Sequence, residues 1–206
     1  MGNLFSKFFG TVGVIDSIRV TLVMSFWSTL IASMLGIFLG LVLEQTKFPG
    51  KKLVVRVNRT LMGAPPVVIG LLTYMLLRKK GPFGALRWVF TIKGMVTAQV
   101  LIITPIVCGM VYSYAVRTFA RTMGADRHQT ARLLLREMKN EIYFAVVSGY
   151  GRSISEVGAV FLVGGNIKNS TRTMTTAIST LKGAGDYYEG VFLGVILMLL
   201  AFAVQT

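Results

Sequence analysis

The chain is poor in the residues that form disulfides and metal clusters. Its 206 residues include one cysteine, Cys108, and one histidine, His128. A disulfide needs two cysteines, and a protein metal site needs several cysteine, histidine or carboxylate ligands. We therefore expect no disulfide within the chain and no resident metal or other cofactor.

The chain also lacks the motifs of nucleotide binding and of nucleophilic catalysis. The stretch 49–52, PGKK, contains a Gly-Lys pair but neither the earlier glycine nor the hydroxyl residue of a P-loop. The stretch 151–155, GRSIS, begins like a nucleophile elbow but lacks its final glycine, and no histidine is placed to serve it. A membrane enzyme is therefore disfavoured, and the chain cannot bind ATP in the P-loop mode.

Acidic residues are scarce as well. Eight Asp and Glu stand against 22 Lys and Arg, which gives a net charge of +14. In a soluble protein such a charge would indicate nucleic acid as a partner. Here the basic residues gather at the ends of apolar segments, where anionic lipid headgroups account for them. The charge therefore predicts contact with membrane lipids and not with nucleic acid.

Apolar residues are abundant, at 53% of the chain with a mean hydropathy of +0.66. A transmembrane helix needs about 20 mostly apolar residues. Five stretches meet or approach that length, at about 20–43, 61–77, 92–116, 142–165 and 188–204. The sequence thus predicts an all-α, multi-pass integral membrane protein with about five transmembrane helices, forming a single domain over residues 1–206.

A polar segment at 117–140 lies between the third and fourth predicted spans. It carries several arginines around Gly124, and such a patch belongs at the membrane surface, where it can meet another protein. Basic residues are almost equally frequent on the two sides of the spans, so the positive-inside rule barely decides the orientation. We place this segment in the cytosol, with the N-terminus outside, because a cytosolic partner must reach it.

The fourth predicted span contains two charged residues, Arg152 and Glu156, four positions apart on one helical face. Charged residues within a membrane usually face a bundle interior or an aqueous path and pair with one another. The pair is therefore a candidate for the translocation pathway or gate. A structural pair that locks helix packing is the alternative.

Prolines and hydroxyl residues supply the other pathway candidates. Pro65 and Pro66 interrupt the second predicted span, and backbone groups freed by proline are tolerated in membranes where helices pack or a cavity holds water. A polar cargo crossing the membrane needs hydrogen-bond partners, which hydroxyl and amide groups provide. The candidates of this kind are Ser153, Ser155, Asn166, Thr171 and Thr173. Bonds from these side chains to nearby backbone are the alternative.

Several motifs in series carry a resemblance to a known family. In order they are PGKK, LMGAPPVVIGLLTYMLL, GPFGALRWVFT, the segment around Gly124, and GRSISEVGAVFLVGGNIKNSTRTMTTAI. This series resembles the permease subunits of prokaryotic ABC importers for oxyanions, and most closely those for tungstate, with molybdate and sulfate permeases related. The resemblance covers residues 20–204.

The resemblance implies a type I, molybdate-permease-like transmembrane domain in the cytoplasmic membrane of a prokaryote. It implies a homodimer that works with cytosolic ABC ATPase subunits, which bind ATP and magnesium, and with an extracytoplasmic tungstate-binding protein. Molybdate or sulfate is the alternative cargo. A self-contained ion channel, suggested by the filter-like stretch 148–151, is the alternative of a different class.

The segment around Gly124 resembles the EAA loop of this family, a coupling helix that docks on the ATPase. Ala120 and Gly124 match the alanine and glycine of that motif, whereas Thr118 stands at its glutamate position and Phe119 at its second alanine. Salt bridges of the general motif are therefore not carried over. The predicted coupling residues are Thr118, Ala120, Arg121, Met123, Gly124, Ala125 and Arg127.

Overall fold

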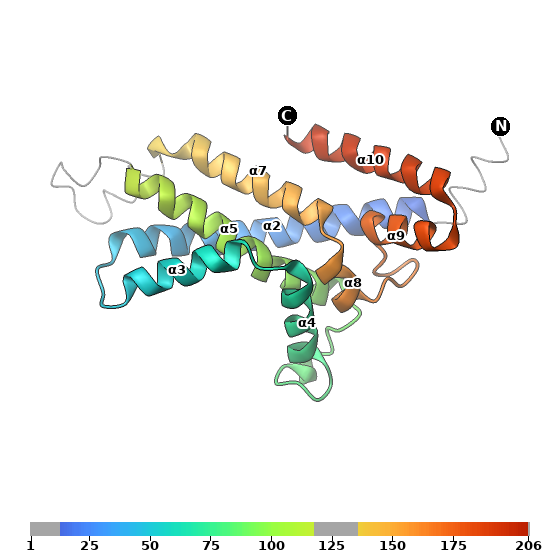
Figure 1. Ribbon diagram of the computed structural model, residues 1–206, viewed down its shortest axis with the longest axis horizontal. Coiled ribbons are helices and arrows are strands. Elements are labelled where there is room, and N and C mark those ends of the chain that lie inside the picture. The colour runs from blue at the N-terminus through green and yellow to red at the C-terminus, as the bar shows by residue number, and fades with distance from the viewer. Residues whose placement is uncertain (1–12, 118–135, 206) are drawn as a thin grey trace.

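The computed structural model describes residues 13–117 and 136–205, and the predicted all-α class is confirmed there, with no strand in these two ranges (Figure 1). The helices are α2 (Val14–Gln45), α3 (Lys51–Met62), α4 (Pro66–Leu77), the 3-10 turn η1 (Gly84–Leu86), α5 (Ile92–Arg117), α7 (Lys139–Ser155), α8 (Gly158–Gly164), α9 (Met174–Ala184) and α10 (Tyr187–Gln205).

Two of these helices, α2 and α5, are long and apolar enough to cross a membrane on their own. Helices α3 and α4 make a third span if the bent pair is counted as one. Helix α10 occupies the predicted fifth span but is shorter than a full crossing as an apolar helix, over Tyr187–Ala203. The predicted count of about five spans is therefore not confirmed within the described residues.

The predicted span 61–77 covers parts of two helices, and the interruption predicted at Pro65 and Pro66 lies between them. Helix α3 ends at Met62, α4 begins at Pro66, and the chain bends by 103° between them. Pro66 disfavours helical backbone at the preceding residue, and Pro65 is extended, with φ −61° and ψ 122°. Pro66 itself suits the first turn of a helix because no partner is needed there for its missing N–H.

The predicted span 142–165 is also two helices instead of one. Helix α7 ends at Ser155 and α8 begins at Gly158, with the backbone of Glu156 extended at φ −73° and ψ 128°. The predicted span had crossed this point because its residues are apolar on both sides of the charged pair. The break places Glu156 at a junction between helices.

The long helices α2 and α5 form the centre of the fold and run in the same direction. A Cβ built on Gly36 would lie 2.7 Å from the Cβ of Val107, and one built on Gly40 would lie 3.0 Å from the Cβ of Val111. Glycine at these positions lets the two backbones approach closely. Helix α7 packs on both helices in the opposite direction, and Ala145 joins a buried cluster with Ala32 and Val107.

Candidate functional site at the junction of α7 and α8

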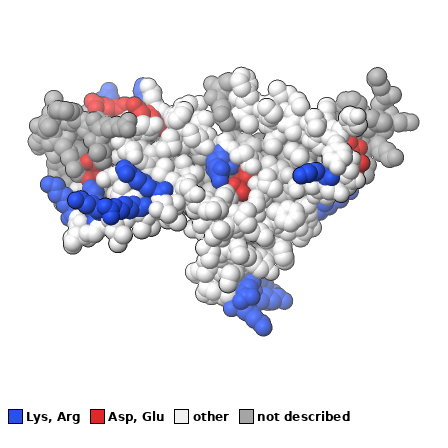
Figure 2. Space-filling model, in the orientation of Figure 1, with Lys and Arg blue, Asp and Glu red and all other residues white. Residues whose placement is uncertain are grey.

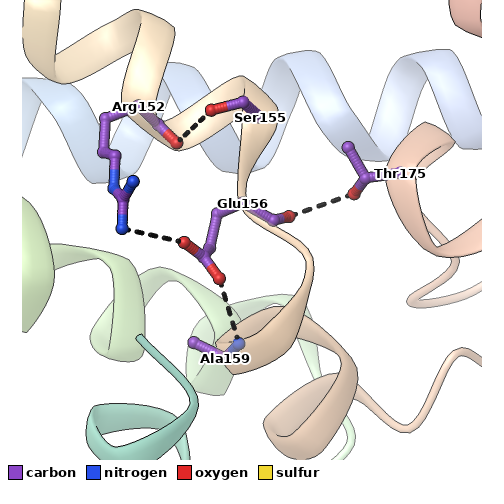
Figure 3. A network of polar contacts seen from close by, with 5 residues as sticks. All are labelled: Arg152, Ser155, Glu156, Ala159 and Thr175. Carbon is purple, nitrogen blue, oxygen red and sulfur yellow. Dashed lines mark hydrogen bonds and ion pairs between the residues drawn. The ribbon is translucent and has the colours of Figure 1, made fainter. Parts of the chain in front are cut away.

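The break between α7 and α8 holds a buried carboxylate beside an arginine (Figure 3). The Nη2 of Arg152 lies 3.6 Å from the Oε2 of Glu156, so the predicted pairing is confirmed. The two side chains differ in exposure, at 42% for Arg152 and 6% for Glu156. The side chain of Arg152 is thus partly exposed, while the carboxylate of Glu156 is enclosed by protein.

Glu156 links three helices through its remaining polar atoms. Its Oε1 accepts a hydrogen bond from the backbone N–H of Ala159, at 3.3 Å, in the first turn of α8. Its backbone carbonyl accepts one from the hydroxyl of Thr175 on α9, at 3.0 Å. These bonds satisfy backbone groups that a helix break would otherwise leave unpaired, which is costly in a buried site. Glu156 therefore stabilises the junction as well as pairing with Arg152.

The first turn of α4 packs directly against this junction. A Cβ built on Gly158 would lie 2.6 Å from the Cγ2 of Val67, and one built on Gly70 would lie 2.5 Å from the Cα of Ala159. The turn at Pro65 and Pro66 immediately precedes Val67. The structure therefore brings together the proline turn and the charged pair, which sequence reasoning had singled out separately.

The serine candidates occupy the last turn of α7. Ser153 is fully buried and shares a hydrogen bond of 2.8 Å with Ser28 of α2. The hydroxyl of Ser155 is exposed and donates to the carbonyl of Arg152 at 3.2 Å. Ser153 therefore joins α7 to α2, whereas Ser155 lies at the exposed side of the junction.

The remaining candidates lie around the loop between α8 and α9. The hydroxyl of Thr171 donates to the carbonyl of Gly164 and accepts from the N–H of Ile167. Thr173 caps α9 through a capping box with Thr176. The amide of Asn166 donates to Thr180 at 2.7 Å and accepts from Arg172 at 3.2 Å. Each of these groups has an internal partner, which fits the alternative reading in which they hold the loop.

Sequence reasoning missed a line of buried hydroxyl groups on α2. Ser17, Thr21, Ser25, Ser28, Thr29 and Ser33 all lie on the buried face of this helix. Gln99 of α5 is also fully buried, and its amide atoms have no hydrogen-bond partner within the described ranges. The recurrence of serine and threonine every three or four positions was the available signal.

The predicted coupling residues between Thr118 and Arg127 lie outside the described residues. The ends of the flanking helices are described: α5 leads into this segment at Arg117, and α7 follows it from Lys139. Because α5 and α7 are antiparallel and pack on each other, the end of α5 and the start of α7 lie at one end of the bundle.

Comparison with known proteins identifies the class and then the family. No family model matches the chain. The fold is that of ABC transporter membrane subunits, since the chain superimposes with a TM-score of 0.75 on one from a bacterial alginate ABC transporter solved with an alginate pentasaccharide-bound periplasmic protein. That likeness covers 93% of this chain and 75% of the other, at 18% sequence identity.

Closer relatives are found by sequence. The chain is 37% identical to the tungstate uptake system permease protein TupB of Peptoclostridium acidaminophilum, over 86% of this chain and 81% of that protein. It is 35% identical to a probable anion ABC transporter permease of Haloferax volcanii, over 90% and 85% of the two chains. TupB of Campylobacter jejuni is 34% identical, over 98% and 87%. The chain therefore belongs to the family of ABC-type anion permeases that includes TupB.

Proposed function

We propose that this chain is the permease subunit of an ABC importer for tungstate in the cytoplasmic membrane of a prokaryote. It works as a homodimer, driven by cytosolic ABC ATPase subunits that bind ATP and magnesium, and it receives the anion from an extracytoplasmic tungstate-binding protein. The observation that carries the proposal is the kinship over most of the chain with two permeases named for tungstate uptake.

The junction of α4, α7 and α8 is the proposed pathway element. Transporter sites commonly form where membrane helices are interrupted, because the free backbone groups there can serve a polar cargo. Two interrupted spans meet at this junction, next to Pro65 and Pro66. Arg152, with its exposed guanidinium, can donate to an oxyanion, and exposed Ser155 can do so once its hydroxyl rotates away from the carbonyl of Arg152.

Glu156 would repel a dianion if its charge were exposed on the pathway. Its carboxylate is enclosed, and it is neutralised in part by Arg152 and by the N–H of Ala159. We propose that Glu156 fixes the orientation of Arg152 and the geometry of the break, and that Ser153 joins this gate to α2. Asn166, Thr171 and Thr173 serve the same site by holding the loop that follows α8.

Tungstate import needs a mechanical link to the ATPase, and the segment around Gly124 is the proposed link. Closure of the ATPase subunits must have a different free energy in the inward-open and outward-open states, since otherwise it cannot shift the permease between them. A short helix containing Thr118, Ala120, Arg121, Met123, Gly124, Ala125 and Arg127 and docked in the ATPase provides that difference.

Gly124→Asp tests the link. We expect this variant to lose ATPase assembly or ATP-coupled uptake and to insert into the membrane as the wild type does. Gly183→Asp is the matched control, because a side chain at Gly183 meets nothing within 4 Å. Full tungstate uptake by Gly124→Asp would remove the docking proposal.

The cargo is tested by competition. Vesicles containing the complete transporter should accumulate labelled tungstate with little inhibition by a large excess of molybdate or sulfate, because the binding protein delivers its preferred anion. Equal inhibition by all three anions would instead assign the chain to a general oxyanion importer. Preferential inhibition by molybdate or by sulfate would assign it to that anion.

A further inference from the structure

A second polar region lies away from the junction, at the turn from α2 to α3. There a cavity of about 640 Å³ is lined by five basic residues and by Tyr112 of α5. The basic residues are Lys47, Lys51, Lys52, Arg56 and Arg59. Figure 2 shows Lys and Arg atoms gathered over α3 on this face of the molecule, and a separate group at the tip of the α4 arm.

The wall of this cavity is held in place by Lys51. Its Nζ donates to the backbone carbonyls of Glu44 at 3.0 Å and Thr46 at 3.1 Å. The same ammonium lies 5.7 Å from the ring centroid of Tyr112, within the range of a cation–π interaction. Lys51 therefore ties the end of α2 and the start of α3 to α5, and the cavity is a built feature of the fold.

The other basic side chains point along one face of α3. Lys52, Arg56 and Arg59 follow one another at helical spacing, and all three are exposed. Among the described residues, none of them forms an ion pair with a carboxylate. The positive end of the α3 dipole lies at the same cavity, since Gly50 and Lys51 line it at the first turn. Such an arrangement attracts a small group of negative charge.

The opposite face of α3 is apolar and exposed. Leu53, Val57 and Leu61 recur every four residues and are 64%, 49% and 42% exposed. A helix with a basic face and an exposed apolar face is typical of the membrane interface, where lipid phosphates lie beside the chains. Asn58 anchors the helix to the bundle by donating to the carbonyl of Pro105 at 3.1 Å.

We propose that this cavity binds a phosphate-type tetrahedral oxyanion group at the membrane surface. Arginine is suited to the planar, paired hydrogen bonds that such a group accepts, and Arg56 and Arg59 are the principal ligands. Lys52 adds a further donor. The group has two possible sources, the headgroup of an anionic lipid and a free oxyanion in solution. The proposal does not depend on tungstate being the cargo.

The test uses the full chain in lipid nanodiscs, with one arm for each source. In the first arm, discs of phosphatidylcholine are titrated with inorganic phosphate and binding is measured by calorimetry. In the second, discs containing phosphatidylglycerol are analysed by native mass spectrometry, which counts the anionic lipids that remain bound. Both arms compare the wild type with Arg56→Gln/Arg59→Gln.

Arg78→Gln/Lys79→Gln is the matched control. It also removes two positive charges, but from a smaller basic cavity of about 440 Å³ near the end of α4. We expect the Arg56/Arg59 variant to weaken binding by about tenfold or more in at least one arm, because two charge-assisted hydrogen bonds are lost. The control should bind as the wild type does.

The outcomes separate the sources and decide the proposal. Loss confined to the phosphate arm assigns a free oxyanion, and loss confined to the lipid arm assigns a headgroup. Wild-type binding by the Arg56/Arg59 variant in both arms would overturn the proposal, because the two arginines would then not bind the group. Equal loss in the control would also overturn it, because the effect would then follow from net charge alone. If the double variant does not fold, Lys52→Gln is measured in its place, with an expected weakening in the same arm.

Discussion

The α2–α5 contact and the α4–α8 contact are both made by glycine, yet they join different kinds of helix. Gly36 and Gly40 belong to α2 and contact α5, and these two long, continuous helices run in the same direction. Gly70 belongs to α4, a helix of 12 residues, and contacts α8, a helix of seven residues that follows a break. Close backbone approach is therefore used once in a scaffold and once at a polar junction.

The difference teaches where polar chemistry can be placed in such a fold. The ion pair Arg152–Glu156 lies at the α7–α8 break. A continuous membrane helix satisfies its own backbone groups and leaves few for a cargo. Interrupted helices expose such groups and need side chains such as Glu156 to hold them. The predictions below test whether substitutions at the α2–α5 contact mainly lower stability and whether substitutions at the junction mainly lower transport.

Gly36→Leu should have the largest effect on stability. The new side chain would collide with Val107 on a helix that is held along its length, and overpacking of this kind costs about 1 to 3 kcal/mol. We expect a lower unfolding temperature in nanodiscs and less folded protein in the membrane. Gly183→Leu, at an open position, should change neither quantity. Equal stability of the two variants would contradict the close α2–α5 packing.

Gly70→Val should have a smaller effect on stability and a large effect on uptake. The new Cβ would lie 2.5 Å from the Cα of Ala159, so α4, a helix of 12 residues, and α8, a helix of seven residues, must shift apart to relieve the collision. We expect a loss of about 1 kcal/mol in unfolding free energy, at the low end for overpacking. ATP-driven tungstate uptake per folded transporter should fall well below that of the wild type. Normal uptake would show that the α4–α8 contact plays no part in transport.

Glu156→Gln should have the smallest effect on stability. Glutamine keeps an oxygen that can accept from Ala159, and an ion pair with a partly exposed arginine contributes about 1 kcal/mol or less. Uptake should nevertheless fall, because Arg152 loses the charge that orients it. The double variant Arg152→Gln/Glu156→Gln is the check. If the pair acts as a unit, the double variant loses no more uptake than the worse single variant.

The class of the fold and the two continuous helices were predictable from composition alone. The stretches 20–43 and 92–116 are long apolar runs, and both lie within observed helices. Both breaks were signalled, but only the first was recognised as an interruption. Pro65 and Pro66 marked the end of α3, and the pair Arg152 and Glu156 marked the end of α7. Hydropathy averages over such points, so each had been joined into one span.

Contacts between distant parts of the chain could not be predicted. Ser28 and Ser153 are 125 residues apart and form a buried hydrogen bond that no local pattern indicates. Helix α3 was missed for another reason. No helix had been predicted between the first two spans, although Leu53, Val57 and Leu61 gave the period of an amphipathic helix.

The most direct test of driven import is omission of one component at a time. Sealed vesicles would hold this chain with its ATPase, with the binding protein supplied on the extracytoplasmic side, and labelled tungstate would be followed with and without ATP. The account predicts accumulation against a gradient only when the chain, the ATPase, the binding protein and ATP are all present. Tungstate flux through this chain alone, without ATP, would contradict the account and assign the chain to the channels.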